Sequence, residues 1–316
     1  MILVTGATGF VGGVLVRRLA ADPSFNGVVA AVRRKAETLP EGVAQVLVGD
    51  LLPVTDWRTA LQGVYAVVHC AARVHVMQDD ADEPLQAYRE VNVSGTLNLA
   101  RQAAYAGVRR FVFVSSIKVN GESTQPGHAF TADDVPAPLD PYGVSKFEAE
   151  LGLREIELQT GMEVVIVRPP LVYGPGVKAN FAAMMRWVAR GIPLPLGATQ
   201  NARSMVALDN LVDLLVTCVK HPAAAGQTLL VSDGEDVSTT ELLRRTAQSM
   251  GKKAFLLPIP AFVLEWGAAL LGKRAVAQRL SGTLQLDINK TRQLLDWTPP
   301  VSLDEGLRRA AEGFSQ

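Results

Sequence analysis

Short apolar runs in the first half of the chain alternate with longer stretches in which apolar positions recur every three or four residues. The apolar runs are 2–5, 28–32, 43–48, 64–69, 111–115 and 163–167, and the amphipathic stretches lie near 12–21, 55–62, 84–106 and 142–160. Continuous Val, Ile and Leu runs are typical of strands buried on both faces, and the longer period is typical of helices. The alternation predicts a parallel sheet covered by helices on both faces.

The pattern changes after Arg168, where loops rich in proline and glycine replace the regular alternation and a return strand is expected at 227–231. Right-handed crossovers build a doubly wound parallel sheet of the Rossmann type, with its ligand at the carboxyl ends of the strands. We therefore expect an α/β protein with a dinucleotide-binding domain over 1–170, return segments near 205–232, and a smaller C-terminal substrate lobe over 171–316.

The bulk composition argues against several classes of protein. The 316 residues include 31 Lys and Arg and 31 Asp and Glu, so the formal net charge is zero and a nucleic-acid partner is not expected. Cys70 and Cys218 both lie in apolar runs. This placement predicts buried thiols in a reducing compartment rather than a disulfide, and no metal site is expected.

The N-terminus begins directly with a strand and a glycine-rich turn, without the charged and long apolar regions of an export signal. We therefore expect a cytoplasmic protein without stable membrane insertion. The apolar stretch 259–271 is too short to span a bilayer and contains Glu265. We interpret it as a core helix, with a membrane-surface helix as the alternative.

A glycine-rich turn follows the first apolar run. In Gly6-x-x-Gly9-x-x-Gly12 the first glycine permits a tight turn, the second lets a pyrophosphate approach the backbone, and the third allows close helix–strand packing. Such a triplet by itself indicates little more than a turn. Directly after a buried strand, it predicts a dinucleotide site at a helix N-terminus.

The end of the second apolar run bears on which nicotinamide dinucleotide is bound. No acidic residue lies within 27–36 to bind the ribose 2′-hydroxyl of NAD, whereas Arg33 and Arg34 suit the 2′-phosphate of NADP. NADP(H) is therefore the expected cofactor and NAD(H) the alternative. Asp50, followed by Leu51, is expected either near the adenine or in an ordinary turn after the third strand.

Tyr142 and Lys146 stand four residues apart on one face of an expected helix, and Ser116 follows the strand at 111–115. A phenol titrates near about 10, so it exchanges protons at neutral pH only if a neighbouring cation stabilises the phenolate. Lys146 is spaced to do this, and Ser116 is placed to orient a carbonyl or hydroxyl group. With the glycine turn, these residues predict the acid–base centre of a nicotinamide enzyme.

Taken in order, these motifs resemble the extended short-chain dehydrogenase/reductases, and the resemblance covers nearly the whole chain. It is strongest to the nucleotide-sugar branch, which includes UDP-glucose 4-epimerase, the sugar-nucleotide dehydratases and the 4-keto-sugar reductases. The motifs that carry it are Gly6-x-x-Gly9-x-x-Gly12, Asp50-Leu51, His69-Cys-Ala-Ala72, Asn92-Val-Ser-Gly-Thr96, Ser115-Ser116, Tyr142-x-x-x-Lys146 and Arg168-Pro-Pro.

The resemblance implies that Ser116 and Tyr142 contact the sugar C4 oxygen, that Lys146 binds the nicotinamide ribose, and that Asn92 supports the helix beside the site. The expected cofactor-binding residues are Gly6, Thr8, Gly9, Phe10, Val11, Gly12, Arg33, Arg34, Asp50, Leu51, Ala71, Ala72, Asn92, Ser115, Tyr142, Lys146 and Pro169. The residues expected to bind a UDP-sugar, besides Ser116 and Tyr142, are Asn180, Phe181, Leu194, Leu196, Arg203 and Arg279.

Three functions stay open at this point. Arg33 and Arg34 favour a reductase that exchanges NADPH at each turnover, and Leu171 stands where epimerases of the resembled branch have asparagine. We therefore predict NADP(H)-dependent reduction of the 4-keto group of a UDP-linked 6-deoxy, N-acetyl hexose for surface polysaccharides such as O-antigen, a sugar that the resemblance alone implies. The alternatives are an NAD-dependent UDP-sugar 4-epimerase and a non-catalytic NADP(H)-sensing regulator. The resemblance also implies a homodimer formed by helices 84–106 and 142–160.

Overall fold

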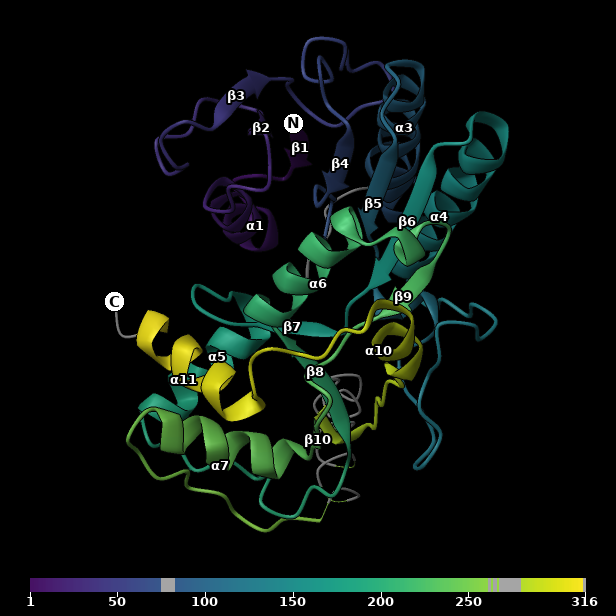
Figure 1. Cartoon of the computed structure of the whole chain (residues 1–316). Helices are drawn as coiled ribbons and strands as arrows, with labels where there is room; N and C mark the ends of the chain where they lie inside the picture. The colour runs from purple at the N-terminus through teal and green to yellow at the C-terminus, as the bar shows by residue number, and fades with distance from the viewer. Residues whose placement is uncertain (75–82, 261–262, 264–265, 267–279, 315–316) are drawn as a thin grey trace.

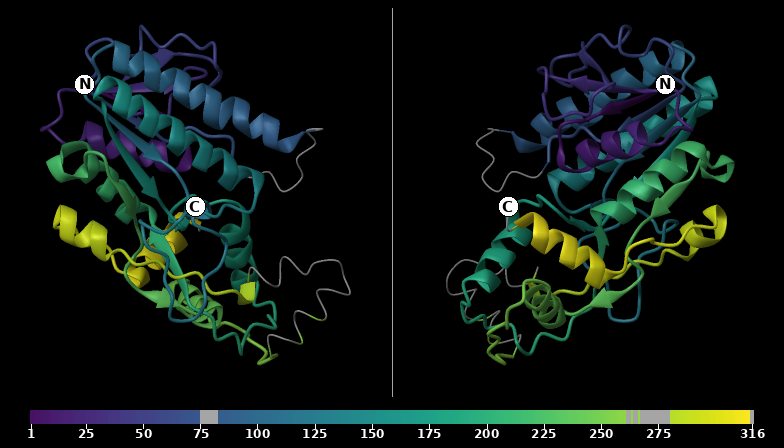
Figure 2. Two further views of the ribbon diagram at one scale, coloured as in Figure 1. Left: turned by 90° about the vertical axis from the view of Figure 1, so that its right-hand side faces the viewer. Right: turned by 60° about the vertical axis from the view of Figure 1, so that its left-hand side comes forward.

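The computed structural model describes the chain except for residues 75–82, 261–262, 264–265, 267–279 and 315–316. Figure 1 shows a main sheet flanked by helices, with a second group of helices and short strands below it. The two views in Figure 2 show the same division into two lobes. Within the described residues, no helix is long and apolar enough to cross a membrane.

Seven strands form the main sheet in the order β3-β2-β1-β4-β5-β6-β9. They are β1 (Ile2–Thr5), β2 (Val28–Val32), β3 (Ala44–Leu47), β4 (Ala66–His69), β5 (Arg110–Val114), β6 (Glu163–Arg168) and β9 (Thr228–Leu230). Every neighbouring pair is parallel, so the predicted doubly wound sheet with a return strand is confirmed. The strand order reverses between β1 and β4, and ligands bind at the carboxyl ends of strands beside such a reversal.

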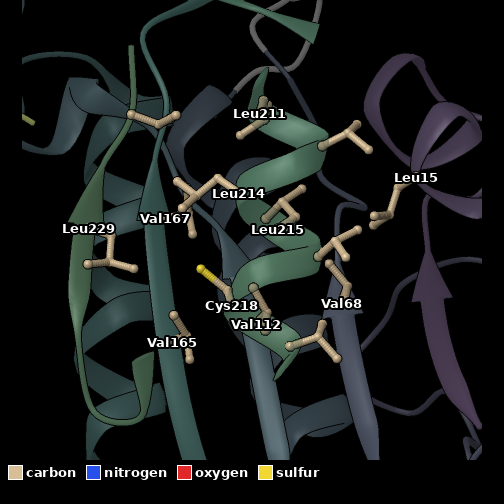
Figure 3. Close-up of a cluster of buried hydrophobic side chains, with 14 of the residues drawn as sticks. Leu15, Val68, Val112, Val165, Val167, Leu211, Leu214, Leu215, Cys218 and Leu229 are labelled. Atoms are coloured by element: carbon tan, nitrogen blue, oxygen red, sulfur yellow. The ribbon is translucent and has the colours of Figure 1, made fainter. Parts of the chain in front are cut away.

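Helices cover both faces of this sheet. They are α1 (Phe10–Ala20) and α6 (Leu208–Lys220) on one face, and α3 (Thr96–Tyr105) and α4 (Pro141–Thr160) on the other. Figure 3 shows the apolar side of α6, with Leu214, Leu215 and Cys218, against Val112 and Val167 of the strands. Strands that contact helices on both faces must be apolar throughout, which explains their continuous hydrophobic runs.

A helical segment of three parts precedes β5: α2 (Pro84–Tyr88), the π-helix η1 (Arg89–Gly95) and α3. The π-helix lies beside the loop that follows β3. A Cβ atom on Gly95 would lie 2.7 Å from the carbonyl oxygen of Leu51, so this close approach requires glycine. The helix predicted over 84–106 is therefore present, with a local widening that the sequence did not indicate.

The helix predicted at 55–62 is wrong, because this segment forms turns. Trp57 and Leu61 are buried four residues apart, as on a helix, and the Leu61 amide donates to the Trp57 carbonyl oxygen at 3.0 Å. Gly63, with a positive φ of 66°, ends the segment after this single turn. Trp57 and Leu61 therefore have the spacing of buried residues on a helix, but the segment forms only one turn.

The second lobe contains a small sheet in the order β10-β8-β7. Its strands are β7 (Leu171–Tyr173), β8 (Arg203–Ala207) and β10 (Asp236–Val237), and its helices are α5 (Ala179–Ala189), α7 (Thr239–Ser249) and α11 (Leu303–Phe314). The remaining described helices are η2 (Ile117–Val119), η3 (Pro222–Ala224) and α10 (Asn289–Leu295). Between β8 and β10 the chain returns to the main sheet through α6 and β9.

The stretch 259–271, interpreted from the sequence as a core helix, lies mostly outside the described residues. Val263 and Trp266 are described, and their exposed fractions are 44% and 76%. The interpretation of the stretch as a core helix therefore stays a prediction, with these two side chains exposed.

Candidate functional site

The three predicted catalytic residues come from two neighbouring elements at the carboxyl end of β5. Ser116 follows β5, and its Oγ accepts a hydrogen bond from the Lys118 amide at 3.2 Å. Tyr142 and Lys146 lie in the first turns of α4, where the N-cap Asp140 accepts a hydrogen bond from the Gly143 amide at 2.7 Å. A side-chain cap satisfies an amide that the helix leaves unpaired and fixes where the helix begins.

Lys146 is a buried cation, with 2% of its surface exposed. Its Nζ donates to the Val114 carbonyl oxygen at 2.8 Å and lies 4.4 Å from the centre of the Phe113 ring. Burial lowers the pKa of Lys146 to about 8, although Cys70 and Glu150 act in the opposite direction. The ammonium form therefore still predominates at neutral pH.

Tyr142 does not have the lowered pKa that the sequence predicted. Burial, followed by the charges of Asp140 and Tyr88, raises the pKa of the Tyr142 phenol above its ordinary value. The Lys146 Nζ lies 6.0 Å from the centre of the Tyr142 ring, and the Tyr88 ring packs edge-on against it at 6.1 Å. In the protein alone, Tyr142 is a protonated phenol, because burial disfavours the phenolate.

His69, at the end of β4, joins three elements behind the site. The Ala71 amide donates to Thr5 Oγ1 at 3.2 Å, and the same oxygen lies 2.7 Å from His69 Nδ1. His69 Nε2 lies 3.0 Å from Thr96 Oγ1, so each ring nitrogen has a hydroxyl partner. Burial, with a smaller effect of Lys146, lowers the pKa of His69 to about 3, so the ring is neutral.

The glycine turn between β1 and α1 has the geometry of a phosphate cradle. Gly6 has a φ of +64°, and a Cβ atom there would lie 2.9 Å from the Ala71 amide nitrogen. A Cβ atom on Gly12 would lie 2.2 Å from the Gly6 carbonyl oxygen. The N-cap Gly9 provides no side-chain cap, and the first turn of α1 contains no acidic residue. The amides of this turn therefore fit a dinucleotide pyrophosphate.

The other residues expected at this turn differ in exposure. Thr8 is exposed, while Phe10 and Val11 pack in part against the hydrophobic core below α1. Ala71 and Ala72, which follow β4, are half-buried. The structure thus brings β1, α1 and the segment after β4 together at one edge of the sheet, as the sequence predicted.

Arg33, after β2, forms an exposed ion pair with Asp50, after β3, with 3.4 Å between Nη1 and Oδ1. No acidic residue directly follows β2 in the sequence, but Asp50, which follows β3, lies beside the end of β2 in the folded protein. Leu51 is half-buried beside Gly95, and Arg34 is exposed. A carboxylate beside Arg33 weakens the argument that the strand end is built only for a 2′-phosphate.

Two buried polar groups support α4 from below. Asn92 pairs with both backbone groups of Arg73, at 2.8 and 3.0 Å, and donates to Ser145 Oγ at 3.0 Å. The Ser115 hydroxyl donates to Glu150, which also forms a buried two-pronged ion pair with Arg168. These contacts fix α4 against the strand ends. The Pro169 carbonyl oxygen likewise accepts from the Ile117 amide at 2.9 Å.

Sequence reasoning missed Glu150, Ser145 and the partners of Lys118. Glu150 stands four residues after Lys146, on the same side of α4, and this spacing could have identified it. Lys118 forms ion pairs with Asp140, which caps α4, and with Glu122 at 3.3 Å. Neither ion-pair partner lies in a motif that the sequence singled out.

The residues expected to bind the substrate lie in different environments of the second lobe. Asn180 is exposed in the first turn of α5, whereas Phe181 is buried and its ring stacks on Tyr173 at 5.4 Å. Leu194 and Leu196 belong to a hydrophobic cluster of this lobe. Their side chains are therefore core residues, and they would shape a substrate site through the backbone.

Arg203 lies in β8, and its Nη1 donates to the Gly282 carbonyl oxygen at 3.0 Å. Burial lowers the pKa of Arg203 from its ordinary value. Arg279 lies outside the described residues, so the structure gives it no place.

A family model described as "NAD dependent epimerase/dehydratase family" matches residues 2–232. The matched range contains the glycine turn, Ser116, Tyr142, Lys146 and the buried supports of α4. The chain belongs to this family. Membership agrees with the resemblance to the extended short-chain dehydrogenase/reductases and with a nicotinamide cofactor.

Family members that match over nearly the full length agree with the assignment. The chain is 51% identical to "UDP-glucose 4-epimerase" of Vibrio cholerae over 316 residues, covering 100% of this chain and 95% of that protein. It is 29% identical to "N-acetyl-alpha-D-glucosaminyl-diphospho-ditrans,octacis-undecaprenol 4-epimerase" of Escherichia coli O157:H7, covering 98% and 94%. The fold matches the crystal structure of UDP-glucuronic acid 4-epimerase from Bacillus cereus in complex with NAD, with a TM-score of 0.80, 23% identity and 100% and 96% coverage.

The prediction of a 4-keto-sugar reductase is wrong, because the relative that is 51% identical across the whole chain is an epimerase. The prediction rested on a basic strand end without an acid, and the structure places Asp50 against Arg33. It also rested on Leu171, which is a half-exposed residue of β7. The sequence of the β2 end alone could not show that Asp50, which follows the neighbouring strand β3, lies against Arg33.

Proposed function

We propose that the protein is an NAD-dependent UDP-sugar 4-epimerase, with UDP-glucose and UDP-galactose as its first test substrates. The observation that supports it most is the set of Ser116, Tyr142 and Lys146 in a chain 51% identical throughout to a UDP-glucose 4-epimerase. A non-catalytic nucleotide sensor would have no need of this acid–base set.

In the proposed reaction, Tyr142 first loses its proton to solvent once the cofactor is bound. As the phenolate it takes the proton from the sugar C4 hydroxyl and later returns it, while Ser116 hydrogen-bonds to the same oxygen. Lys146 supplies a positive charge near the phenol, with its Nζ 6.0 Å from the centre of the Tyr142 ring. NAD⁺ held at the glycine turn of α1 would supply a reversible hydride acceptor for C4, so the reaction would have no net redox change.

The cofactor proposal is NAD held at the glycine turn by the amides of α1. The turn fits a pyrophosphate, because glycine is required at residues 6 and 12 by the contacts of their Cβ positions. Asp50, after β3, supplies an acidic group beside the end of β2, where it pairs with Arg33. A preference for NADP(H), expected from Arg33 and Arg34, stays a prediction.

The test is interconversion of UDP-glucose and UDP-galactose by the purified protein, followed by chromatography of the sugar nucleotides. We expect conversion without net consumption of NADH or NADPH. Tyr142→Phe should lower kcat by about 100-fold or more while NAD affinity is retained, because it removes only the proton-transferring oxygen.

Tyr105→Phe is the matched control, because 97% of Tyr105 is exposed at the end of α3. Its kcat should equal that of the unaltered protein. The proposal would be overturned by full activity of Tyr142→Phe, or by stoichiometric NADPH oxidation with a 4-keto sugar and no epimerisation.

A further inference from the structure

The second lobe carries several large apolar side chains at its surface, all of them in the last turns of α5, the loop after it and the segment after α7. The exposed fractions are 44% for Trp187, 39% for Ile192, 63% for Phe255 and 42% for Leu257. Single exposed apolar residues are common, but a group that includes an indole and a phenyl ring indicates an interaction site.

These residues lie on two neighbouring segments of the chain. Leu194 donates its amide to the Phe255 carbonyl oxygen at 2.8 Å, and the Leu257 amide donates to the Leu194 carbonyl oxygen at 2.8 Å. The Ile192 amide donates to the Trp187 carbonyl oxygen at 3.2 Å. The two segments therefore run side by side, and we call the exposed residues Trp187, Ile192, Phe255 and Leu257 the apolar lobe face.

Side chains along 254–257 alternate between buried and exposed positions. Ala254 and Leu256 pack inward against the hydrophobic cluster that contains Leu194 and Leu196. Phe255 and Leu257 therefore point away from that cluster, because successive side chains of an extended segment alternate between its two sides. Further along the chain, Val263 and Trp266 are exposed as well.

A basic rim accompanies the apolar lobe face. Arg186, Arg190, Lys252 and Lys253 are all exposed next to its residues, and Lys252 donates to the Ala189 carbonyl oxygen, which ties the two segments together. Over 178–201 the sequence has three basic residues and no acidic one. The whole chain, in contrast, has 31 of each sign.

Aromatic and aliphatic side chains within a basic rim match the chemistry of a lipid interface. Indole and phenyl rings partition to the headgroup region, and Lys and Arg are attracted by anionic lipids. A second copy of the chain fits less well, because two copies meeting at this face would bring like charges together. None of the described helices is long and apolar enough to span the membrane.

We propose that the apolar lobe face docks the protein on an anionic membrane surface. Apolar side chains enter the headgroup region, and the basic rim holds them there by attraction to lipid phosphates. The proposal does not depend on the sugar that the enzyme uses, because none of these residues belongs to the catalytic centre or the glycine turn.

The test is co-sedimentation of the full chain with vesicles of phosphatidylglycerol and phosphatidylcholine in equal amounts, and with vesicles of phosphatidylcholine alone. We expect binding to the anionic vesicles, at least tenfold weaker binding to the neutral ones, and a loss of binding as salt is raised. Trp187→Ser combined with Phe255→Ser should weaken anionic binding at least tenfold, and Lys252→Glu combined with Lys253→Glu should do the same.

The matched control combines Val54→Ser with Val135→Ser, two residues that are 85% and 86% exposed elsewhere on the surface. It should bind vesicles like the unaltered protein. Docking would be overturned if the unaltered protein stayed in the supernatant, if the Trp187 and Phe255 variant bound equally well, or if that variant changed the oligomeric mass instead. Epimerase activity of the same samples separates the two proposals, because vesicle binding without activity would count against the proposed function alone.

Discussion

At the residue scale, the site combines a buried ammonium with a phenol that is harder to ionise than an ordinary tyrosine. Burial lowers the pKa of Lys146 to about 8 and raises that of Tyr142. Both shifts have the same cause, since loss of water disfavours the charged form of either group. The ligand-free site therefore disfavours the ionised form of Tyr142 and, to a smaller extent, the ammonium form of Lys146.

Cofactor choice is a prediction at the residue scale. If NADP(H) is preferred, Arg33→Ala combined with Arg34→Ala should weaken NADP binding by about 10- to 100-fold, because each charge-assisted contact contributes about 1.5 to 3 kcal/mol. NAD binding should change little. Isothermal titration with both dinucleotides measures this, with Lys35→Ala as a control at the adjoining exposed position. Equal losses for NAD and NADP, or none for either, would contradict the prediction.

His69 predicts a specific dependence of stability on pH. Its pKa falls from 6.5 to about 3 in the folded protein, so between these values the unfolded chain binds a proton that the folded protein does not. The free energy of unfolding should therefore fall as the pH is lowered from 6.5 towards 3, by up to about 5 kcal/mol from this group. Urea unfolding at a series of pH values measures the slope.

His69→Gln should reduce that slope, because glutamine does not titrate. His128→Gln is the control, since His128 lies exposed in a loop. Equal slopes for all three proteins between pH 6.5 and 4 would show that His69 does not act as described.

At the scale of elements, close approaches of backbone determine where the helices lie. α1 can begin against the glycine turn only because Gly12 lacks a Cβ, while Gly13 has room for one, 3.4 Å from the Ala7 carbonyl oxygen. α4 is fixed in turn by its N-cap Asp140 and by the ion pair of its Glu150 with Arg168 of β6. The positions of the glycine turn and of the residues on α4 therefore depend on where α1 and α4 begin, and neither helix has much room to shift.

Gly12→Ala and Gly13→Ala form a matched pair of substitutions within α1. Gly12→Ala should lower the free energy of unfolding by about 1 to 3 kcal/mol and weaken NAD binding, because the new methyl group meets the backbone of the turn. Gly13→Ala should leave NAD binding unchanged and stabilise the helix by up to about 1 kcal/mol. Thermal unfolding and NAD titration measure both. Unchanged NAD affinity in Gly12→Ala would contradict the assignment of the turn.

The sequence predicted the strands of the main sheet well, because a strand buried on both faces has to be apolar at every position. It failed at 55–62, where Trp57 and Leu61 imitate helical spacing over a single turn, and it did not predict β7 or β10, which are too short to show a period. The motif residues Ser116, Tyr142 and Lys146 could be found from spacing. Their buried supports could not, since a partner such as Arg168 is recognisable only once the strands are placed side by side.

At the scale of the whole molecule, the predicted homodimer stays a proposal with a candidate surface. Leu151 and Leu158, seven residues apart on one side of α4, are 55% and 87% exposed. Pairing of α3 and α4 with a second copy would cover them. This surface is separate from the apolar lobe face, so the protein could dimerise and still present two basic faces.

Leu151→Glu combined with Leu158→Glu should convert a dimer to a monomer, because the added charges would be buried unpaired in the interface. Light scattering after size exclusion distinguishes the dimer from a monomer of 33.8 kDa. Val135→Glu, at an exposed position away from α4, controls for added charge. A monomeric unaltered protein, or a double variant with the dimer mass, would sink the proposal.

The return of α6 and β9 to the main sheet has a consequence for engineering the enzyme. A fragment ending near residue 170 would lack both elements, and Val112, Val165 and Val167, which α6 and its neighbours cover, would face water. Neither lobe is therefore a module that can be cut out or grafted at one junction. A chimera that takes its sugar-binding parts from another family member must exchange interleaved segments on both sides of α6 and β9, and must keep those two elements with the sheet they complete.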